Sequence, residues 1–203
     1  MTDRVVELYY DVVCPFAYLG STQIEALAAR TGARVVFRPM LLGGVFKALG
    51  APADLTSSMP EAKRRHNERD MHRWAAHWGV PLVVPAQHPR STVLAMRAIL
   101  AAGEPSFARA THALYRAYWV EERDVTVPEV VAGVLDGAGL DGSDIATRAT
   151  SQPIKDDLRA RTDEAVSRGV FGAPTFFVGG EMYWGQDRLG FVEAALGAQF
   201  TVR

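Results

Sequence analysis

Hydrophobic residues near the start of the chain form two continuous runs separated by an amphipathic segment. Residues 5–13 are rich in β-branched and aromatic side chains and predict a buried strand. Residues 16–30 place alanine, leucine and isoleucine at helical spacing, and Gly32 follows as a helix C-cap. Residues 34–38 predict a second strand. The three segments together predict one βαβ unit with parallel strands and a right-handed crossover.

The middle of the chain has a different pattern. Residues 40–59 are rich in glycine, proline and hydroxyl residues and predict a loop-rich connector. Residues 60–78 are densely charged, and their apolar side chains at three- and four-residue steps predict one helical face, made by Met71, Trp74, Ala75 and Trp78. Further helices are predicted at 91–102, 105–120, 128–138, 142–150 and 153–168. A short extended piece is predicted at 80–84.

Strand character returns after Gly169. Residues 175–178 and 182–184 flank a Gly-Gly pair and predict a β-hairpin, and residues 186–196 predict a last amphipathic helix. Neither end of the chain has enough strands for a sheet of its own. We therefore predict an α/β fold in which residues 1–45 and 155–203 form one sheet domain and residues 46–154 form an inserted helical domain.

The composition narrows the class of protein. The 203 residues are 48% hydrophobic and 22% charged, which excludes intrinsic disorder and a collagen-like repeat. Lys and Arg total 22 against 23 for Asp and Glu, so there is no basic excess for nucleic acid or an anionic membrane. A single cysteine excludes an intrachain disulfide framework. With no signal-peptide layout and no apolar run near the roughly 20 residues of a membrane span, we predict a cytoplasmic protein.

The sharpest chemical feature is Cys14, at the junction of a predicted strand and a predicted helix. Unpaired N–H groups and the positive dipole end of a helix favour a thiolate or a bound anion, so we expect the pKa of this thiol to be lowered. The alternative is an inert buried thiol, because free cysteines are among the most buried residue types. Ala17 stands where a C-x-x-C motif would have its second cysteine, so a dithiol cycle within this chain is impossible.

Two segments near the C-terminus offer polar groups to a ligand. A cis Ala173-Pro174 bond would leave the backbone of Ala173 free to pair with an extended peptide-like ligand, although an ordinary strand-initiating proline explains the same residues. Gly185 ends the preceding strand, and Gln186 and Asp187 begin a predicted helix whose free N–H groups could hold a carboxylate, while the side chain of Asp187 could pair with an ammonium group. The alternative is that Asp187 complements the helix dipole.

Other candidate residues carry weaker signals. No two of His66, His72 and His77 are three or four residues apart, so no helical metal site is predicted. Lys63 belongs to a basic run typical of a solvated helix face, and Lys47 could meet an anionic substrate. No phosphate loop and no dinucleotide fingerprint is present.

Taken together, several motifs resemble the 2-hydroxychromene-2-carboxylate isomerase family, which is related to kappa-class glutathione transferases and to the disulfide oxidoreductase DsbA. The resemblance spans essentially the whole chain. The matching segments are residues 10–20 (YDVVCPFAYLG), 38–47 (RPMLLGGVFK), 69–70, 73–75, 117–119, 170–175 (VFGAPT) and 184–189 (WGQDRL).

The resemblance implies a thioredoxin-like domain with an inserted all-helical domain, glutathione as cofactor and a homodimer. Cys14 occupies the position at which the isomerases have a serine beside the glutathione sulfur. The implied glutathione-binding residues are Cys14, Lys63, Ala173, Pro174, Trp184, Gly185, Gln186 and Asp187. The resemblance implies Lys47 as a substrate-side residue, and we also predict His88 and Arg90 as residues that hold the substrate anion.

Two positions depart from the family pattern. Cys14 replaces the serine, and a thiol, unlike a hydroxyl, can also form a mixed disulfide with glutathione. Ala51 stands where the family often has asparagine, so part of the substrate or glycyl-end contact differs.

Three functions follow as hypotheses. The first is a glutathione-dependent cis–trans isomerase acting on a small aromatic carboxylate of the hydroxychromene type. The second is a kappa-class glutathione transferase or a monothiol thiol–disulfide oxidoreductase in which Cys14 is the nucleophile. The third is a ligand- or peptide-binding module that keeps the groove beside the proline without catalysis.

Overall fold

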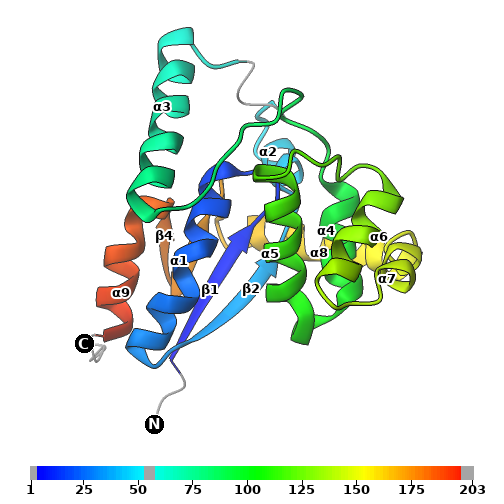
Figure 1. Cartoon of the computed structure of the whole chain (residues 1–203). Coiled ribbons are helices and arrows are strands. Elements are labelled where there is room, and N and C mark those ends of the chain that lie inside the picture. The colour runs from blue at the N-terminus through cyan, green and yellow to red at the C-terminus, as the bar shows by residue number, and fades with distance from the viewer. Residues whose placement is uncertain (1–3, 53–57, 198–203) are drawn as a thin grey trace.

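A mixed four-stranded sheet forms the centre of the protein (Figure 1). The computed structural model describes residues 4–52 and 58–197. The strand order is β2-β1-β3-β4, where β1 (Val5–Tyr10) is parallel to β2 (Arg34–Pro39) and antiparallel to β3 (Thr175–Val178). β4 (Glu181–Trp184) closes the hairpin with β3. The sheet thus combines strands from both ends of the chain, as the sequence predicts for a thioredoxin-like fold.

Alternating side chains of β1 attach helices to both faces of the sheet. The hydroxyl of Tyr10 lies 2.6 Å from that of Thr111 on α5 (Phe107–Trp119). On the opposite face, the hydroxyl of Tyr9 donates to Glu164 of α8 (Gln152–Ser167) at 2.9 Å. Helices α1 (Pro15–Thr31) and α9 (Leu189–Gly197) pack against each other on the α5 side. The α1 helix ends, as predicted, at Gly32 in the left-handed region.

The strand predicted over residues 5–13 is shorter than expected. β1 ends at Tyr10 because the chain turns at Asp11, whose carbonyl accepts a hydrogen bond from the N–H of Cys14 at 3.1 Å. This turn leads directly into α1.

The loop predicted over residues 40–59 is wrong in part, because it contains helix α2 (Leu42–Ala48). Gly43 and Gly44 lie within this helix. A Cβ atom on Gly44 would lie 2.9 Å from Cγ2 of Thr162, so glycine here permits close packing of α2 on α8. Residues 53–57 of the predicted connector lie outside the described residues.

The predicted helices of the middle region are present with small shifts at their ends. They are α3 (Glu61–Trp78), α4 (Val93–Ala102), a 3₁₀ turn η1 (Glu104–Ser106) that precedes α5, α6 (Pro128–Gly137), α7 (Gly142–Arg148) and α8. Residues 80–84 form no strand. α3 extends well beyond the sheet, and α4 to α7 cluster at the other side of the molecule (Figure 1). The division into residues 1–45 with 155–203 and residues 46–154 stays a prediction, with its two boundaries inside α2 and α8.

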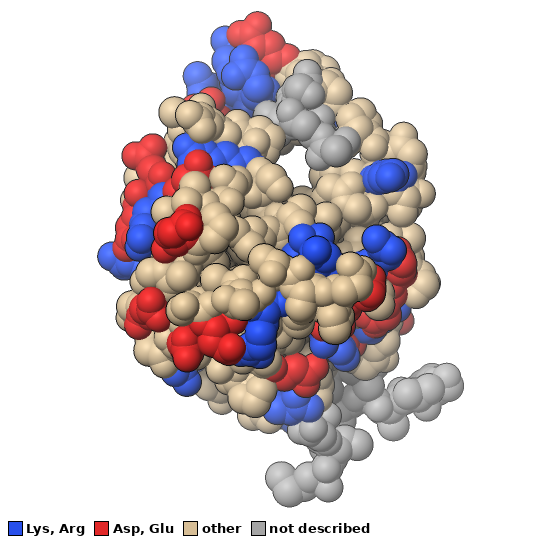
Figure 2. Space-filling view, turned by 90° about the vertical axis from the view of Figure 1, so that its right-hand side faces the viewer, with Lys and Arg blue, Asp and Glu red and all other residues tan. Residues whose placement is uncertain are grey.

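The surface carries both signs of charge. Acidic and basic side chains are interspersed over the face drawn in Figure 2. Within the described part of the chain, no helix combines the length and the apolar character needed to cross a membrane.

Candidate functional site

Cys14 is the N-cap residue of α1, with extended backbone dihedral angles and Pro15 in the first helical turn. Its side chain is only 7% exposed. The thiol donates a hydrogen bond to the carbonyl oxygen of Ala173, with Sγ and O 3.1 Å apart. The structure therefore brings together the two segments that the sequence singles out, one from each end of the chain.

The expectation of an acidic thiol is wrong for this structure. Burial raises the pKa of Cys14 to about 12, and the nearby carboxylate of Asp11 adds to the rise. Hydrogen bonds from the backbone N–H groups of Ala17 and Phe16 oppose it, as expected for a helix N-terminus. Desolvation outweighs the helix effect because the sulfur is almost fully enclosed. At neutral pH Cys14 is thus a protonated hydrogen-bond donor.

The Ala173-Pro174 peptide bond is cis, which agrees with the first of the two interpretations of this segment. The buried hydroxyl of Thr175 donates to the carbonyl oxygen of Gly172 at 2.8 Å and closes the loop around the proline. Gly20 of α1 faces this loop, because a Cβ atom there would lie 3.6 Å from Pro174 and 3.5 Å from Gln186. Helix α1 and the cis-proline loop are therefore in direct contact at Gly20, in the part of α1 that follows Cys14.

The second C-terminal segment begins with a shorter element than predicted. Gln186–Arg188 forms a single 3₁₀ turn, η2, and α9 follows it. Gly185 has φ 107°, and its N–H donates to the carbonyl oxygen of Pro174 at 2.9 Å, so this segment lies beside the cis-proline. Asp187 already accepts a hydrogen bond from Arg188 at 2.8 Å, which partly offsets its charge.

A cavity of about 250 Å³ opens beside this turn. Its walls come from α1, from the aromatic face of α3, from η2 and from α9. The lining residues are Gln23, Leu27, Arg30, Trp74, Trp78, Gln186, Asp187, Leu189, Gly190 and Glu193. The helical face predicted for α3 thus serves as a wall of a cavity that also contains two candidate ligand-binding residues.

Trp184 lies at the edge of the cis-proline loop. Its indole is 52% exposed and packs 5.0 Å, between ring centroids, from the ring of Phe171, which is also exposed. A Cβ atom on Gly172 would lie 2.5 Å from Nε1 of Trp184. The tryptophan therefore covers the backbone that leads into the cis peptide bond.

The remaining predicted residues lie on other elements. Lys47 is exposed near the end of α2, and Lys63 is exposed in the first turn of α3. His88 packs 4.9 Å from the ring of Trp119, whose Nε1 donates to the carbonyl oxygen of Val12 at 2.8 Å. Only Val13 separates Val12 from Cys14 in the sequence, so the ring of Trp119 links His88 to the turn that carries the thiol.

Arg90 is partly committed to a partner. Its guanidinium pairs with Asp124 at 3.3 Å, and its side chain is 16% exposed. The Nε atom is buried and has no hydrogen-bond partner within the described residues. The Nε of Arg90 is therefore enclosed by protein, and its charge is shared with Asp124.

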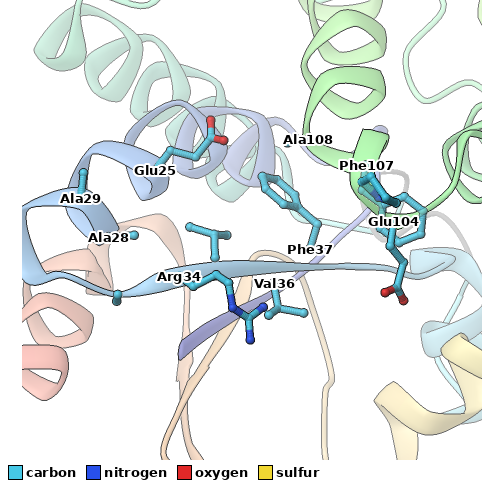
Figure 3. A pocket seen from close by; sticks show the side chains of 12 residues that line it. Glu25, Ala28, Ala29, Arg34, Val36, Phe37, Glu104, Phe107 and Ala108 are labelled. Carbon is cyan, nitrogen blue, oxygen red and sulfur yellow. The ribbon is translucent and has the colours of Figure 1, made fainter. Parts of the chain in front are cut away.

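A larger cavity of about 390 Å³ lies elsewhere, between α1, β2 and the start of α5 (Figure 3). Glu25, Arg34, Phe37 and Glu104 line it, and none of the predicted site residues does. We therefore identify the candidate site by the contact between Cys14 and the cis-proline loop, and not by the volume of the cavity.

Asp11 is a buried residue of the site for which no role was predicted from the sequence. It is 1% exposed, and its carboxylate accepts hydrogen bonds from three different segments. A signal was present, because a carboxylate at the end of a strongly hydrophobic strand must find partners when it is buried.

Comparisons with known proteins cover nearly the whole chain. The family model for the DSBA-like thioredoxin domain matches residues 5–197. A 2-hydroxychromene-2-carboxylate isomerase of Sphingobium xenophagum is 31% identical over 195 residues, which are 95% of this chain and 98% of that protein. The chain belongs to the 2-hydroxychromene-2-carboxylate isomerase family of DSBA-like thioredoxin proteins. This confirms the family recognised from the sequence motifs and the prediction of an isomerase-like enzyme.

A solved structure and a glutathione transferase are also similar to this member of the isomerase family. A solved structure of 2-hydroxychromene-2-carboxylate isomerase superposes with a TM-score of 0.86 at 29% identity, covering 95% of this chain and 94% of that chain. Glutathione S-transferase kappa 1 of Rattus norvegicus is 26% identical over 212 residues, covering 97% of this chain and 92% of that protein. The chain therefore has the fold of the solved isomerase and is also similar in sequence to a kappa-class transferase.

Proposed function

We propose that this isomerase-family protein is a glutathione-dependent cis–trans isomerase of small aromatic carboxylates of the 2-hydroxychromene-2-carboxylate type. One observation carries the proposal: the Cys14 thiol is a buried, protonated donor directed at the carbonyl of Ala173, beside the cis-proline. Such a thiol resembles a serine hydroxyl in its hydrogen bonding. The curated relatives named as isomerases and as glutathione transferases support the same reading.

The residues of the site fit a tripeptide. Ala173 lies at the cis bond, where its main chain is suited to pair with the cysteinyl unit of glutathione. The cavity beside Gln186 and Asp187 offers an amide and a carboxylate for the γ-glutamyl end, next to Trp184 and Gly185. Lys63, exposed in the first turn of α3, would supply a positive charge for the glycyl carboxylate, as the family resemblance implies.

The bound cofactor would supply a thiolate that adds reversibly to a conjugated carbon of the substrate, so that rotation about the former double bond becomes easy. Cys14 would hold that thiolate by turning its S–H away from the carbonyl oxygen of Ala173 and donating its single hydrogen bond to the cofactor sulfur. The N–H groups at the start of α1 add to the electrostatic stabilisation, because they are fixed in a water-poor site before the reaction begins.

Positive charge on the substrate side would orient the carboxylate. Lys47 is exposed on α2, and the guanidinium of Arg90 carries a second positive charge, which is paired with Asp124. His88 packs against Trp119, which donates a hydrogen bond to Val12 of the Cys14 turn. These groups would also stabilise negative charge that develops on the conjugated carbonyl of the substrate.

A second function, a monothiol oxidoreductase or kappa-class transferase, is favoured by the cysteine at position 14 and by the kappa-class relatives. Its nucleophile would have to be a thiolate, and the burial that raises the pKa of Cys14 disfavours that form. We also propose that the protein acts in the cytoplasm as a homodimer, as the family resemblance implies.

The deciding experiment is turnover of 2-hydroxychromene-2-carboxylate with and without glutathione. We expect isomerisation to require glutathione and to saturate with it. Equal rates without the cofactor would remove the proposed mechanism. Formation of a glutathione mixed disulfide during turnover, detected by intact mass, would favour the oxidoreductase instead.

A further inference from the structure

The Asp11 carboxylate connects three segments that surround Cys14. Its Oδ1 accepts from the N–H of Val13 at 3.2 Å and from the hydroxyl of Thr92 at 2.6 Å. Its Oδ2 accepts from the N–H of Leu42 at 2.8 Å. Leu42 is the first residue of α2, and Thr92 is the N-cap residue of α4. One buried side chain thus joins the turn before Cys14 to the starts of two helices.

The backbone of the same residue holds the cysteine itself. The carbonyl oxygen of Asp11 accepts from the N–H of Cys14 at 3.1 Å and from the hydroxyl of Tyr115 at 3.2 Å. Tyr115 is fully buried on α5. Because side chain and main chain of Asp11 are both engaged, a shift of α2 or α4 is transmitted to the position of the thiol.

We propose that Asp11 is a positioning residue that fixes the Cys14 turn against the starts of α2 and α4 and thereby sets the reactivity of the thiol without touching glutathione. The inference uses the proposed function only in taking Cys14 as the residue beside the cofactor sulfur. It also explains why α2, which bears Lys47, keeps a defined position relative to Cys14.

Charge and geometry both contribute to this role. Burial raises the pKa of Asp11, and the hydrogen bonds from Thr92 and Leu42 oppose that rise by stabilising the carboxylate. In its ionised form Asp11 disfavours a second negative charge on Cys14, and the low dielectric of the buried turn strengthens that effect. Tyr115 of α5 is the other titratable side chain that interacts with Cys14 among the described residues. Cys14 ionisation should therefore respond to any change at Asp11.

The test measures the thiol itself, through its ultraviolet absorbance and its rate of alkylation by iodoacetamide as functions of pH. In D11N the carboxylate charge is removed while the size of the side chain is kept. We expect Cys14 to titrate about one pH unit lower. At pH 8 a pKa lower by one unit gives about ten times more thiolate, but each thiolate is about three-fold less nucleophilic. The alkylation rate should therefore rise by about three-fold.

Two threonine variants separate positioning from general stability. T92V removes a hydroxyl that binds Asp11, whereas T111V removes a buried hydroxyl that binds Tyr10 instead. We expect T92V to change the alkylation rate of Cys14 by about three-fold or more, while T111V stays within about two-fold of wild type.

The proposal is overturned if folded D11N and T92V give pH–rate curves that superimpose on the wild-type curve, even if both melt at lower temperature. That result would leave Asp11 a purely structural residue. None of these measurements requires glutathione, so a failure of the proposed function appears separately, as an absence of glutathione binding to the wild-type protein by calorimetry.

Discussion

The thiol of Cys14 and the carbonyl oxygen of Ala173 are hydrogen-bonded at 3.1 Å although 159 positions separate them in the chain. This contact joins the N-terminus of α1 to the cis-proline loop. A thiol that donates here is a neutral group at neutral pH, so its part in the chemistry is that of a donor. The predictions below test that view and the packing that creates it.

Cys14→Ser should keep the isomerase activity within about ten-fold of wild type, since a hydroxyl also donates a hydrogen bond. Cys14→Ala should lose about a hundred-fold in kcat, comparable to removal of one oxyanion-hole donor. Steady-state kinetics at saturating glutathione measure both. Equal, severe losses in the two variants would mean that Cys14 acts as a covalent nucleophile.

Alkaline pH should destabilise the wild type more than Cys14→Ser. The folded protein holds the thiol proton with a pKa of about 12 instead of an ordinary value near 9.0. Stability from this shift is therefore complete below pH 9 and is lost as the pH rises toward 12. At pH 10 the loss is about 1.4 kcal/mol. Denaturant melts at pH 7 and pH 10 should show that extra loss in the wild type, and parallel losses would contradict the burial argument.

Gly172→Ala should displace the indole of Trp184, because the new methyl group would lie 2.5 Å from its Nε1. We expect a change in tryptophan fluorescence and weaker glutathione binding by calorimetry. Gly137→Ala is a matched control, since a Cβ atom there has nothing within 4 Å. Unchanged glutathione affinity in Gly172→Ala would separate Trp184 from the cofactor site.

Arg168→Met should destabilise the fold by about 2 kcal/mol, a value between those of exposed and buried ion pairs. Arg168 donates to both carboxylate oxygens of Glu7 and stacks 4.1 Å from the ring centroid of Phe177. The control is Arg148→Met, whose pair with Asp144 is about half exposed and should matter by less than about 0.5 kcal/mol.

Acid should reduce the difference between Arg168→Met and wild type. Burial alone would raise the pKa of Glu7, but hydrogen bonds from Arg168 and Arg38 lower it below its ordinary value of 4.5. The stability from this shift is present above that value and is lost as the pH falls below it. Urea melts at pH 7 and pH 3 should therefore converge at the lower pH; a constant difference would argue for packing alone.

Features that depend on local sequence were predictable. The Gly32 cap, the start of α1 after Cys14 and the hairpin of β3 and β4 all follow from residue type and spacing within a few positions. The resemblance of the motif order to thioredoxin-type folds implied that Cys14 lies near the proline at position 174, and the shortage of strands at each end predicted one shared sheet.

Features that depend on tertiary packing were not predictable. Glycines at positions 43 and 44 favour a loop in isolation, yet contact with α8 makes them part of α2. The helix N-terminus alone lowers a thiol pKa, whereas the enclosure that reverses this effect at Cys14 comes from segments remote in sequence. The role of Asp11 was hidden for the same reason, since two of its partners, Leu42 and Thr92, lie 31 and 81 positions away.

The central position of β1 has a consequence for synthesis on the ribosome. β1 receives β2 early, but its other neighbour, β3, is made only after residue 174 has emerged. Until then one edge of β1 is unpaired, and Cys14 is not yet covered by the cis-proline loop. An unpaired hydrophobic strand and an exposed thiol make the nascent chain prone to aggregation and oxidation. Synthesis of about the last seventh of the chain, beyond residue 174, is therefore the step that pairs the second edge of β1 and encloses the thiol of Cys14.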